Sequence, residues 1–290
     1  MERTKDPEGF EGGLLSPRLL ASVRDAGDLA ISMRMRGLTS EVKSTKEDIV
    51  TEGDRAVSSA VRGNLSMQFP GIMFMDEELA GSETVDVLAH DLVAIIDPID
   101  GTSNYYNEGV ASSTEAALNP YWGISVGLVR RGEVCAGVIY QPVLRKLFYA
   151  EKGRGAFLNG ARMAVSTTRS LSDARLIYDY PYPKDKREYD LTARVVGRLG
   201  AEVVSMEKLG SQVIEAMEVA EGKRDIFMHL RTKPWDVAAA IAIVTEAGGN
   251  AMDSAGAPYA LGGPSILLTN GVVDIAPLTR IVDEERDTDS

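Results

Sequence analysis

Two aspartates, Asp97 and Asp100, end a strongly apolar run in the segment DLVAIIDPIDGTSNY, residues 91–105. Two carboxylates this close repel each other, and each loses hydration on approaching a core. Pro98 fixes one backbone dihedral and removes a donor, so a stiff turn would aim both carboxylates at one point. A cation between them would offset the repulsion, and oxygen-only ligands suit a hard ion such as Mg²⁺.

The residues after Asp100 offer groups of the kind that hold phosphate. Gly101 would let a ligand approach the backbone closely. Thr102 and Ser103 present hydroxyls and amides that can bind phosphate oxygens at a helix start. The simpler interpretation is that Asp97 and Asp100 only cap a turn, because Asp-Pro commonly begins one. The apolar run before the pair, and acids at other element ends, favour the metal interpretation.

Acids also stand at three other breaks between predicted elements. Asp54 ends the segment KSTKEDIVTEGD and opens a helix. Glu77 and Glu78 follow an apolar strand in MDEELAG, and Asp236 begins the apolar helix of KPWDVAAA. Each acid alone has a structural interpretation, since a carboxylate at a helix start is favourable by about 0.3–1 kcal/mol without any function. Their combination with the aspartate pair indicates one shared site.

Composition narrows the classes of partner. The chain has 290 residues, of which 44% are hydrophobic and 26% charged, as in ordinary soluble globular proteins. A formal charge of −12, from 43 acids and 31 bases, argues against nucleic acid or an anionic membrane as partner. No apolar N-terminal segment and no run of the roughly twenty apolar residues of a membrane span is found. We therefore expect a cytoplasmic protein.

Cysteine and histidine are too few for several kinds of site. Cys135 is the single cysteine, so no intrachain disulfide or thiolate zinc cluster can form. His90 and His229 are the only histidines, which disfavours a histidine-dependent triad or a histidine-rich metal site. The carboxylates are left as the groups that carry the chemistry.

Local signals predict the elements that must position these acids. Ser16 as N-cap, Pro17 at the first helical position and Gly37 as the stop predict a helix between them. Its predicted buried stripe comprises Leu19, Leu20, Val23, Ala26, Ala30 and Ile31.

Further elements follow along the chain. A second helix is predicted from about residue 51 to 69, and short apolar runs at 71–75 and 92–96 predict buried strands. From Trp122, β-rich segments joined by short turns predict an antiparallel meander. Strands alternate with helices after about residue 166. The chain is therefore expected to be a mixed α/β protein.

Two halves are expected within this α/β chain. The N-terminal half, 14–165, would carry the metal loop and the meander, and the C-terminal half, 166–283, would complete the active site. Residues 1–13 and 284–290 read as flexible polar tails.

Two longer segments resemble the signatures of the inositol monophosphatase superfamily of magnesium-dependent, lithium-sensitive phosphatases. DPIDGTSNY is similar to the first signature and PWDVAAAIAIVTEAGG to the second. DIVTEGD, the acids of MDEELAG and the segment GRGAFLNG (153–160) stand at similar positions, so the resemblance covers nearly the whole chain. It implies a layered αβαβα sandwich of the inositol monophosphatase and fructose bisphosphatase type, commonly homodimeric.

The resemblance also implies roles for individual residues. The implied ligands of two or three Mg²⁺ ions are Glu77, Asp97, the carbonyl of Ile99, Asp100 and Asp236. The groups implied to hold phosphate are Asp100, Gly101, Thr102 and Ser103. Asp54 and Thr102 would orient and deprotonate the attacking water. Glu78 would support the ligands or bind a further, weaker ion, and Lys43 matches a family lysine near the active site.

Three features depart from the family pattern. His229 stands seven positions before Asp236, where inositol-specific members carry an acid that binds sugar hydroxyls. Its ring could bind hydroxyls, attract a second anionic group when protonated, or be a buried histidine at the pocket edge or in the core. The segment 106–122 is longer than usual and could roof the pocket, contact a second subunit or be a surface excursion. The segment 178–190, rich in aromatics and lysine, could contact substrate or be a surface loop.

These features predict magnesium-dependent hydrolysis of a small phosphate monoester, with inositol phosphate or a related sugar phosphate first. Alternatives are fructose 1,6-bisphosphate, nucleoside 3′(2′),5′-bisphosphates and histidinol phosphate. A non-catalytic metal- or phosphosugar-binding protein is the alternative of another class. Asp54 and Thr102, which water activation needs and metal capture does not, favour the enzyme.

Overall fold

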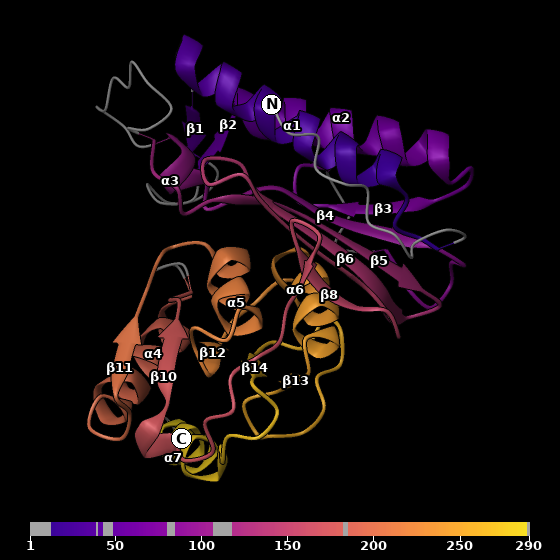
Figure 1. The fold of residues 1–290 in the computed structure, drawn as a ribbon. Coiled ribbons are helices and arrows are strands. Elements are labelled where there is room, and N and C mark those ends of the chain that lie inside the picture. The colour runs from indigo at the N-terminus through magenta and orange to yellow at the C-terminus, as the bar shows by residue number, and fades with distance from the viewer. Residues whose placement is uncertain are drawn as a thin grey trace.

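The computed structural model describes residues 13–38, 40–42, 49–79, 85–106, 118–181 and 185–288. Within them, three layers of helices alternate with two β-sheets (Figure 1). The helices are α1 (Pro17–Arg36), α2 (Glu52–Gln68), α3 (Thr102–Tyr106), α4 (Lys186–Leu199), α5 (Gln212–Ala220), α6 (Pro234–Glu246) and α7 (Ala276–Asp287), with a 3₁₀ turn at Leu171–Asp173. The order αβαβα confirms the layered sandwich expected from the resemblance.

The larger sheet has seven strands in the order β3-β4-β5-β6-β7-β8-β9. Their bounds are β3 (Met73–Asp76), β4 (Val93–Asp100), β5 (Gly123–Arg130), β6 (Glu133–Gln141), β7 (Lys146–Glu151), β8 (Gly155–Leu158) and β9 (Ala161–Arg162). β3 pairs with β4 in parallel, and every later pair is antiparallel. The meander predicted from Trp122 is confirmed.

The smaller sheet has five strands in the order β11-β10-β12-β14-β13. Their bounds are β10 (Arg175–Tyr178), β11 (Ser205–Glu207), β12 (Ile226–His229), β13 (Asn250–Met252) and β14 (Ile266–Thr269). β10, β11 and β12 run parallel, and β14 is antiparallel to both of its neighbours. A separate pair, β1 (Ser40–Val42) and β2 (Ile49–Thr51), precedes α2.

Hydrophobic cores join the layers. α1 and α2 pack on one face of the larger sheet, and α4 and α7 cover the outer face of the smaller one. α5 and α6 lie between the sheets, where Ile139 and Phe148 of the larger sheet share a core with Phe227 and Leu268 of the smaller. The division into halves at residue 165 stays a prediction.

The predicted start and end of the first helix are confirmed. The Ser16 hydroxyl accepts a hydrogen bond from the Leu19 amide at 3.1 Å, Pro17 is the first helical residue, and Gly37 ends the helix at φ 91°. A positive φ favours glycine because a Cβ would clash with the backbone there. The predicted apolar stripe of this helix is buried.

Two glycines allow α6 to lie close to the larger sheet. Gly127 in β5 stands opposite Gly137 in β6. A Cβ on Gly137 would lie 2.4 Å from the carbonyl oxygen of Ala239, and one on Gly127 would lie 2.7 Å from the Cβ of Ala238. Side chains at these positions would push α6, which begins with the segment containing Asp236, away from the sheet.

The strand before the metal loop is longer than expected. The turn predicted at Pro98 is instead part of β4, which continues to Asp100 with an irregular register between Asp97 and Asp100. Proline cannot donate to a strand ladder, so it is tolerated where pairing is irregular. The two carboxylates therefore leave the end of a strand and not a separate turn.

The C-terminal segment also differs from expectation. The sequence predicts a flexible tail over residues 284–290, but α7 continues to Asp287. Arg198 of α4 pairs with Glu284 at 2.7 Å, and Arg194 pairs with Glu285 at 3.2 Å. These ion pairs between helices give the acidic segment partners that its own sequence does not reveal. No helix in the described part of the chain has the length and apolar character of a membrane span.

Candidate active site

Three aspartates converge where β4 ends and α6 begins. Asp97, Asp100 and Asp236 are buried, and one oxygen from each lies within 4.8 Å of the others. Burial raises the pKa of Asp97 well above its usual range, and Glu77, Asp100 and Asp236 add to this by repulsion. Burial likewise raises the pKa of Asp100 to about 7. Without a counter-charge this arrangement is unfavourable.

Donors of the protein hold one oxygen of each strand aspartate. The backbone amide of Ile99 donates to Oδ1 of Asp97 at 3.0 Å. Oδ2 of Asp100 accepts from the Ser211 hydroxyl and, at 2.9 Å, from the Val213 amide. Each carboxylate is thereby held in orientation through one of its oxygens.

Asp236 is held in the same way at the start of α6. Its Oδ2 accepts from the Lys233 amide at 3.1 Å and from the Gln212 side-chain amide at 2.9 Å. Pro234 is the first residue of the helix, where its missing N–H costs nothing. Burial, followed by repulsion from Asp100 and Glu77, raises the pKa of Asp236 well above its usual range.

Asp54 and Thr102 meet although they come from different helices. Asp54 closes a capping box at the start of α2, where its Oδ2 accepts from the Thr51 amide at 2.8 Å. Its Oδ1 is 3.3 Å from the Thr102 hydroxyl, which also lies 3.0 Å from the Ile99 carbonyl. Burial raises the pKa of Asp54 to about 7, although the hydrogen bonds from Thr51 oppose this.

Glu77 and Glu78 follow β3, beside the end of β4. Glu77 is not one of the three clustered acids, but it lies close enough to raise the pKa of all three and of Asp54. The buried carboxylate of Asp76 holds this turn by accepting from the Ser58 hydroxyl at 2.7 Å and the Glu78 amide at 2.9 Å. Both glutamates are half-buried beside the cluster.

Gly101 links the strand to the short helix α3, which begins at Thr102 and includes Ser103. Gly101 has φ 84°, and a Cβ there would lie 2.9 Å from the Tyr121 carbonyl and 3.0 Å from Cβ of Ser211. Glycine is therefore required both for its conformation and for the close approach of two other segments.

His229 lies at the end of β12 and is 2% exposed. Its Nδ1 accepts from the Arg231 amide at 3.2 Å. Burial lowers the pKa of the imidazole to about 4, although Asp179 opposes the shift. The ring is therefore neutral near pH 7, which argues against the alternative in which a protonated ring attracts a second anion.

Several predicted features lie wholly or partly outside the described residues. They are Lys43, residues 107–117 of the longer segment, residues 182–184 of the segment 178–190 and residues 1–12 of the predicted N-terminal tail. The described end of that segment returns to the metal loop, where the Asn119 side-chain amide donates to Oδ1 of Asn104 at 2.8 Å.

The loop before α5 contributes to the site in a way that the sequence does not predict. Ser211 holds Asp100, and the Asn104 side-chain amide donates to the carbonyls of Tyr121 at 2.7 Å and Leu209 at 2.9 Å. The Gly-Ser pair before an apolar helix signals an N-cap. No local signal indicates that the same serine contacts the metal loop.

The donor set of the three-aspartate cluster fits a hard divalent cation. Only carboxylates form it, from three buried residues. Mg²⁺ prefers oxygen ligands, and its charge would offset the repulsion that raises the three pKa values. The residues present therefore fit the ion that the resemblance implies.

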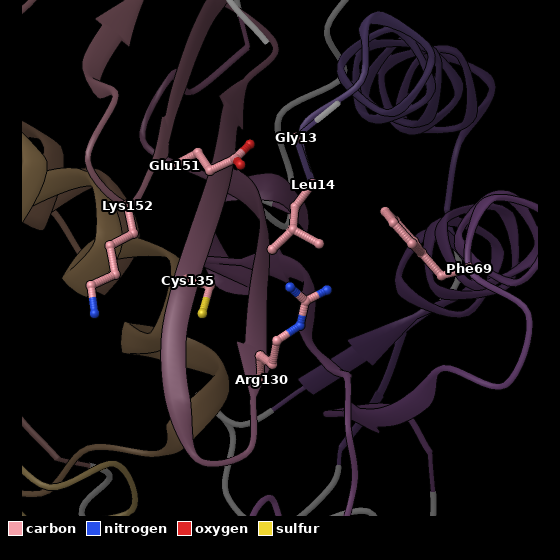
Figure 2. A pocket seen from close by; sticks show the side chains of 7 residues that line it. All are labelled: Gly13, Leu14, Phe69, Arg130, Cys135, Glu151 and Lys152. Carbon is pink, nitrogen blue, oxygen red and sulfur yellow. The ribbon is translucent and has the colours of Figure 1, made fainter. Parts of the chain in front are cut away.

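A cavity elsewhere in the molecule contains none of these residues. It measures about 350 Å³ and lies between α2 and the strands β5, β6 and β7. Figure 2 shows the Glu151 carboxylate beside Gly13 and Leu14, with Lys152 pointing away from Phe69. The Glu151 carboxylate is engaged by the Leu15 amide at 3.1 Å. The cavity is separate from the aspartate cluster.

The family model described as the inositol monophosphatase family matches residues 18–285. The chain belongs to this family. Human inositol monophosphatase 2 is 34% identical over 220 residues, which cover 76% of this chain and 73% of the relative. A Thermotoga maritima protein named fructose-1,6-bisphosphatase/inositol-1-monophosphatase is 33% identical over 233 residues, or 80% and 82% of the two chains.

A solved inositol monophosphatase from Thermotoga maritima shares the fold. It aligns with a TM-score of 0.79 at 30% identity and covers 93% of this chain and 97% of its own. The names of these relatives are those of phosphoric monoester hydrolases, and the chain is an enzyme of that class.

Proposed function

We propose that the chain hydrolyses a small phosphate monoester with Mg²⁺, and that inositol phosphate or a related sugar phosphate is its substrate. The observation that carries the proposal is the convergence of the cluster Asp97, Asp100 and Asp236, with the linked pair Asp54 and Thr102 close by. The cluster would account for metal capture. The pair would account for turnover, which a binding protein would not need.

The metal would be held by the carboxylates of Glu77, Asp97, Asp100 and Asp236, with the Ile99 carbonyl, for two or three ions. When bound, Mg²⁺ neutralises phosphoryl oxygens, lowers the pKa of water and stabilises a leaving alkoxide. Glu78, half-buried beside Glu77, would support the ligands or serve a weaker ion.

Asp54 and Thr102 would activate the attacking water. The Thr102 hydroxyl has one proton to donate and can accept a hydrogen bond from water with its free lone pair. Asp54 would take the proton of that water, and its pKa of about 7 suits a general base near neutral pH. The Thr102 hydroxyl would orient the water, and the Asp54 carboxylate would remove its proton.

Gly101, Thr102, Ser103 and Asp100 would surround the phosphate. Gly101 has no side chain, so the phosphate could approach the backbone closely there. The other residues add hydroxyl and amide groups. Lys43, the lysine implied near the active site, stays a prediction.

A second candidate substrate is fructose 1,6-bisphosphate. The Thermotoga maritima relative carries that activity in its name. In this chain, Lys208 stands near the metal loop and pairs with Asp179, whose charge also raises the pKa of Asp100. The Lys208 ammonium has three N–H donors, so it could keep this ion pair and also contact a second phosphate.

A substrate panel tests the proposal. Phosphate release would be measured with inositol 1-phosphate, other sugar phosphates, fructose 1,6-bisphosphate, adenosine 3′,5′-bisphosphate and histidinol phosphate, each with Mg²⁺ and with EDTA. We expect Mg²⁺-dependent turnover, fastest on a sugar or inositol monophosphate. Mg²⁺ binding with no turnover on any member would favour the non-catalytic alternative.

His229→Glu tests the substrate side of the pocket. A carboxylate there should move preference toward inositol phosphates, as in the inositol-specific members. The same panel measures this, and an unaltered substrate ranking would mean that His229 does not face the substrate. That the chain forms a homodimer stays a prediction, as does its location in the cytoplasm.

A further inference from the structure

The N-terminus of α5, with its N-cap Ser211, holds two of the clustered aspartates at once. Ser211 and Val213 donate to Oδ2 of Asp100, while Gln212 between them donates to Oδ2 of Asp236 at 2.9 Å. Asp100 ends β4 and Asp236 begins α6, so these consecutive residues bridge two elements that supply the cluster. Gln212 is the one member of this bridge that acts through a long side chain.

The orientation of the Gln212 amide follows from its partners. A carboxylate oxygen can only accept, so the amide nitrogen must face Asp236. The amide oxygen then faces Thr232, whose hydroxyl lies 3.1 Å away and donates to it. Thr232 is itself buried, and its backbone amide donates to the Pro264 carbonyl at 2.8 Å.

We propose that Gln212 is a positioning residue for the metal ligand Asp236, and that Thr232 sets its orientation. Oδ2 of Asp236 is occupied by the amides of Gln212 and Lys233. The carboxylate is thereby rotated so that Oδ1 is left for the cation. Such partners tune affinity because a carboxylate held in one orientation loses less freedom on binding metal. The inference rests on the proposed function, since it concerns the same magnesium site.

Gln212→Leu keeps the size of the side chain and removes the hydrogen bond. The Mg²⁺ concentration at half-maximal rise in melting temperature should increase about tenfold. Turnover at low Mg²⁺ should fall and should recover at saturating Mg²⁺.

Thr232→Val tests the hydrogen bond from Thr232 to Gln212. It should weaken Mg²⁺ binding by a smaller factor than Gln212→Leu does. Thr192→Val is the matched control: Thr192 is buried in α4 and donates to the Glu188 carbonyl, far from the cluster in the fold. It should lower the melting temperature equally with and without Mg²⁺. Binding of Mn²⁺, followed by electron paramagnetic resonance, gives a second readout that needs no turnover.

The outcomes separate this inference from the function on which it rests. Superimposable Mg²⁺ titrations of Gln212→Leu and the wild type would overturn the positioning role. A changed KM for substrate with unchanged Mg²⁺ affinity would also overturn it and would make Gln212 a substrate contact. A wild-type protein that binds neither ion would refute the metal site itself, and the positioning role with it.

Discussion

At the scale of single residues, burial determines the chemistry of the acids. Asp54 is 1% exposed and Asp97 is 2% exposed, and each faces other carboxylates. Burial favours the neutral form of a carboxyl group and repulsion adds to this, so a cation is needed to keep the group charged. Predictions at this scale therefore separate the roles of ligand and base.

Asp97→Asn removes one of the repelling charges. Asparagine keeps an oxygen that can accept from the Ile99 amide, so the backbone at the end of β4 should keep its conformation. We expect turnover to fall more than about a hundredfold, since a metal ligand supplies several kcal/mol. The free energy of unfolding without metal should stay the same or rise. Phosphate release and denaturation in EDTA measure the two effects, and unchanged turnover would refute the metal assignment.

Thr102→Ala removes the hydroxyl that links Asp54 to the Ile99 carbonyl. Turnover should fall by about 10²–10⁴-fold, the range for a positioned proton-transfer group. Affinity for Mg²⁺ should stay nearly unchanged, because the carboxylates of the cluster remain. Kinetics across a Mg²⁺ titration check both, and a large loss of metal affinity would contradict the role of Thr102 in orienting water.

At the scale of elements, the spacing between α6 and the larger sheet sets where Asp236 lies. The facing pair Gly127 and Gly137 leaves room for the backbone of the helix at Ala238 and Ala239. The helix is apolar on nearly all sides and packs against both sheets. A displacement of α6 would therefore move Asp236 relative to Asp97 and Asp100.

Gly137→Ala should displace α6, because the new Cβ would lie 2.4 Å from the Ala239 carbonyl oxygen. Overpacking of this kind costs about 1–3 kcal/mol of unfolding free energy. We also expect weaker Mg²⁺ binding, since Asp236 moves with the helix. Urea denaturation and a Mg²⁺ titration measure the two effects.

Gly197→Ala is the matched control for that substitution. Gly197 is exposed in α4, and a Cβ there would meet no atom within 4 Å. Alanine should stabilise the helix by about 0.4–1 kcal/mol and leave Mg²⁺ affinity unchanged. Equal stability of the two alanine variants would show that Gly137 does not limit the distance between α6 and the sheet.

At the scale of the whole molecule, the buried acids link stability to pH. The pKa of Asp54 and that of Asp100 are both raised to about 7, so the folded chain keeps protons that the unfolded chain releases near pH 4. The stability they contribute is complete below about pH 4 and is lost as pH rises through about 7. The metal-free protein is therefore expected to become less stable as the pH rises toward alkaline values.

We expect the metal-free protein to be less stable at pH 8 than at pH 6. Between its unfolded and folded pKa, each of the two groups lowers the free energy of unfolding by up to about 1.4 kcal/mol for each pH unit of increase. Mg²⁺ favours the charged carboxylates, so it should raise the melting temperature more at pH 8 than at pH 6. Thermal scans with EDTA or Mg²⁺ at both pH values check this, and an equal effect of Mg²⁺ at both would contradict the assignment.

The sequence by itself determined the helix caps, the buried strands, the two signatures and the family. Those signals are local, because a cap, an apolar period or a turn acts within a few residues. The loop of Asp97 and Asp100 and the helix start at Asp236 could be identified in this way. That these two segments lie together at one site was inferred from the resemblance.

Only the tertiary structure decided how these segments meet. Ser211 reaches Asp100 across 111 positions and Gln212 reaches Asp236 across 24, while α6 depends on glycines in two other elements. The acidic end of the chain lies in α7, where arginines of α4 pair with it, and His229 is neutral because the fold buries it. Such contacts depend on packing between distant segments, which no local pattern encodes.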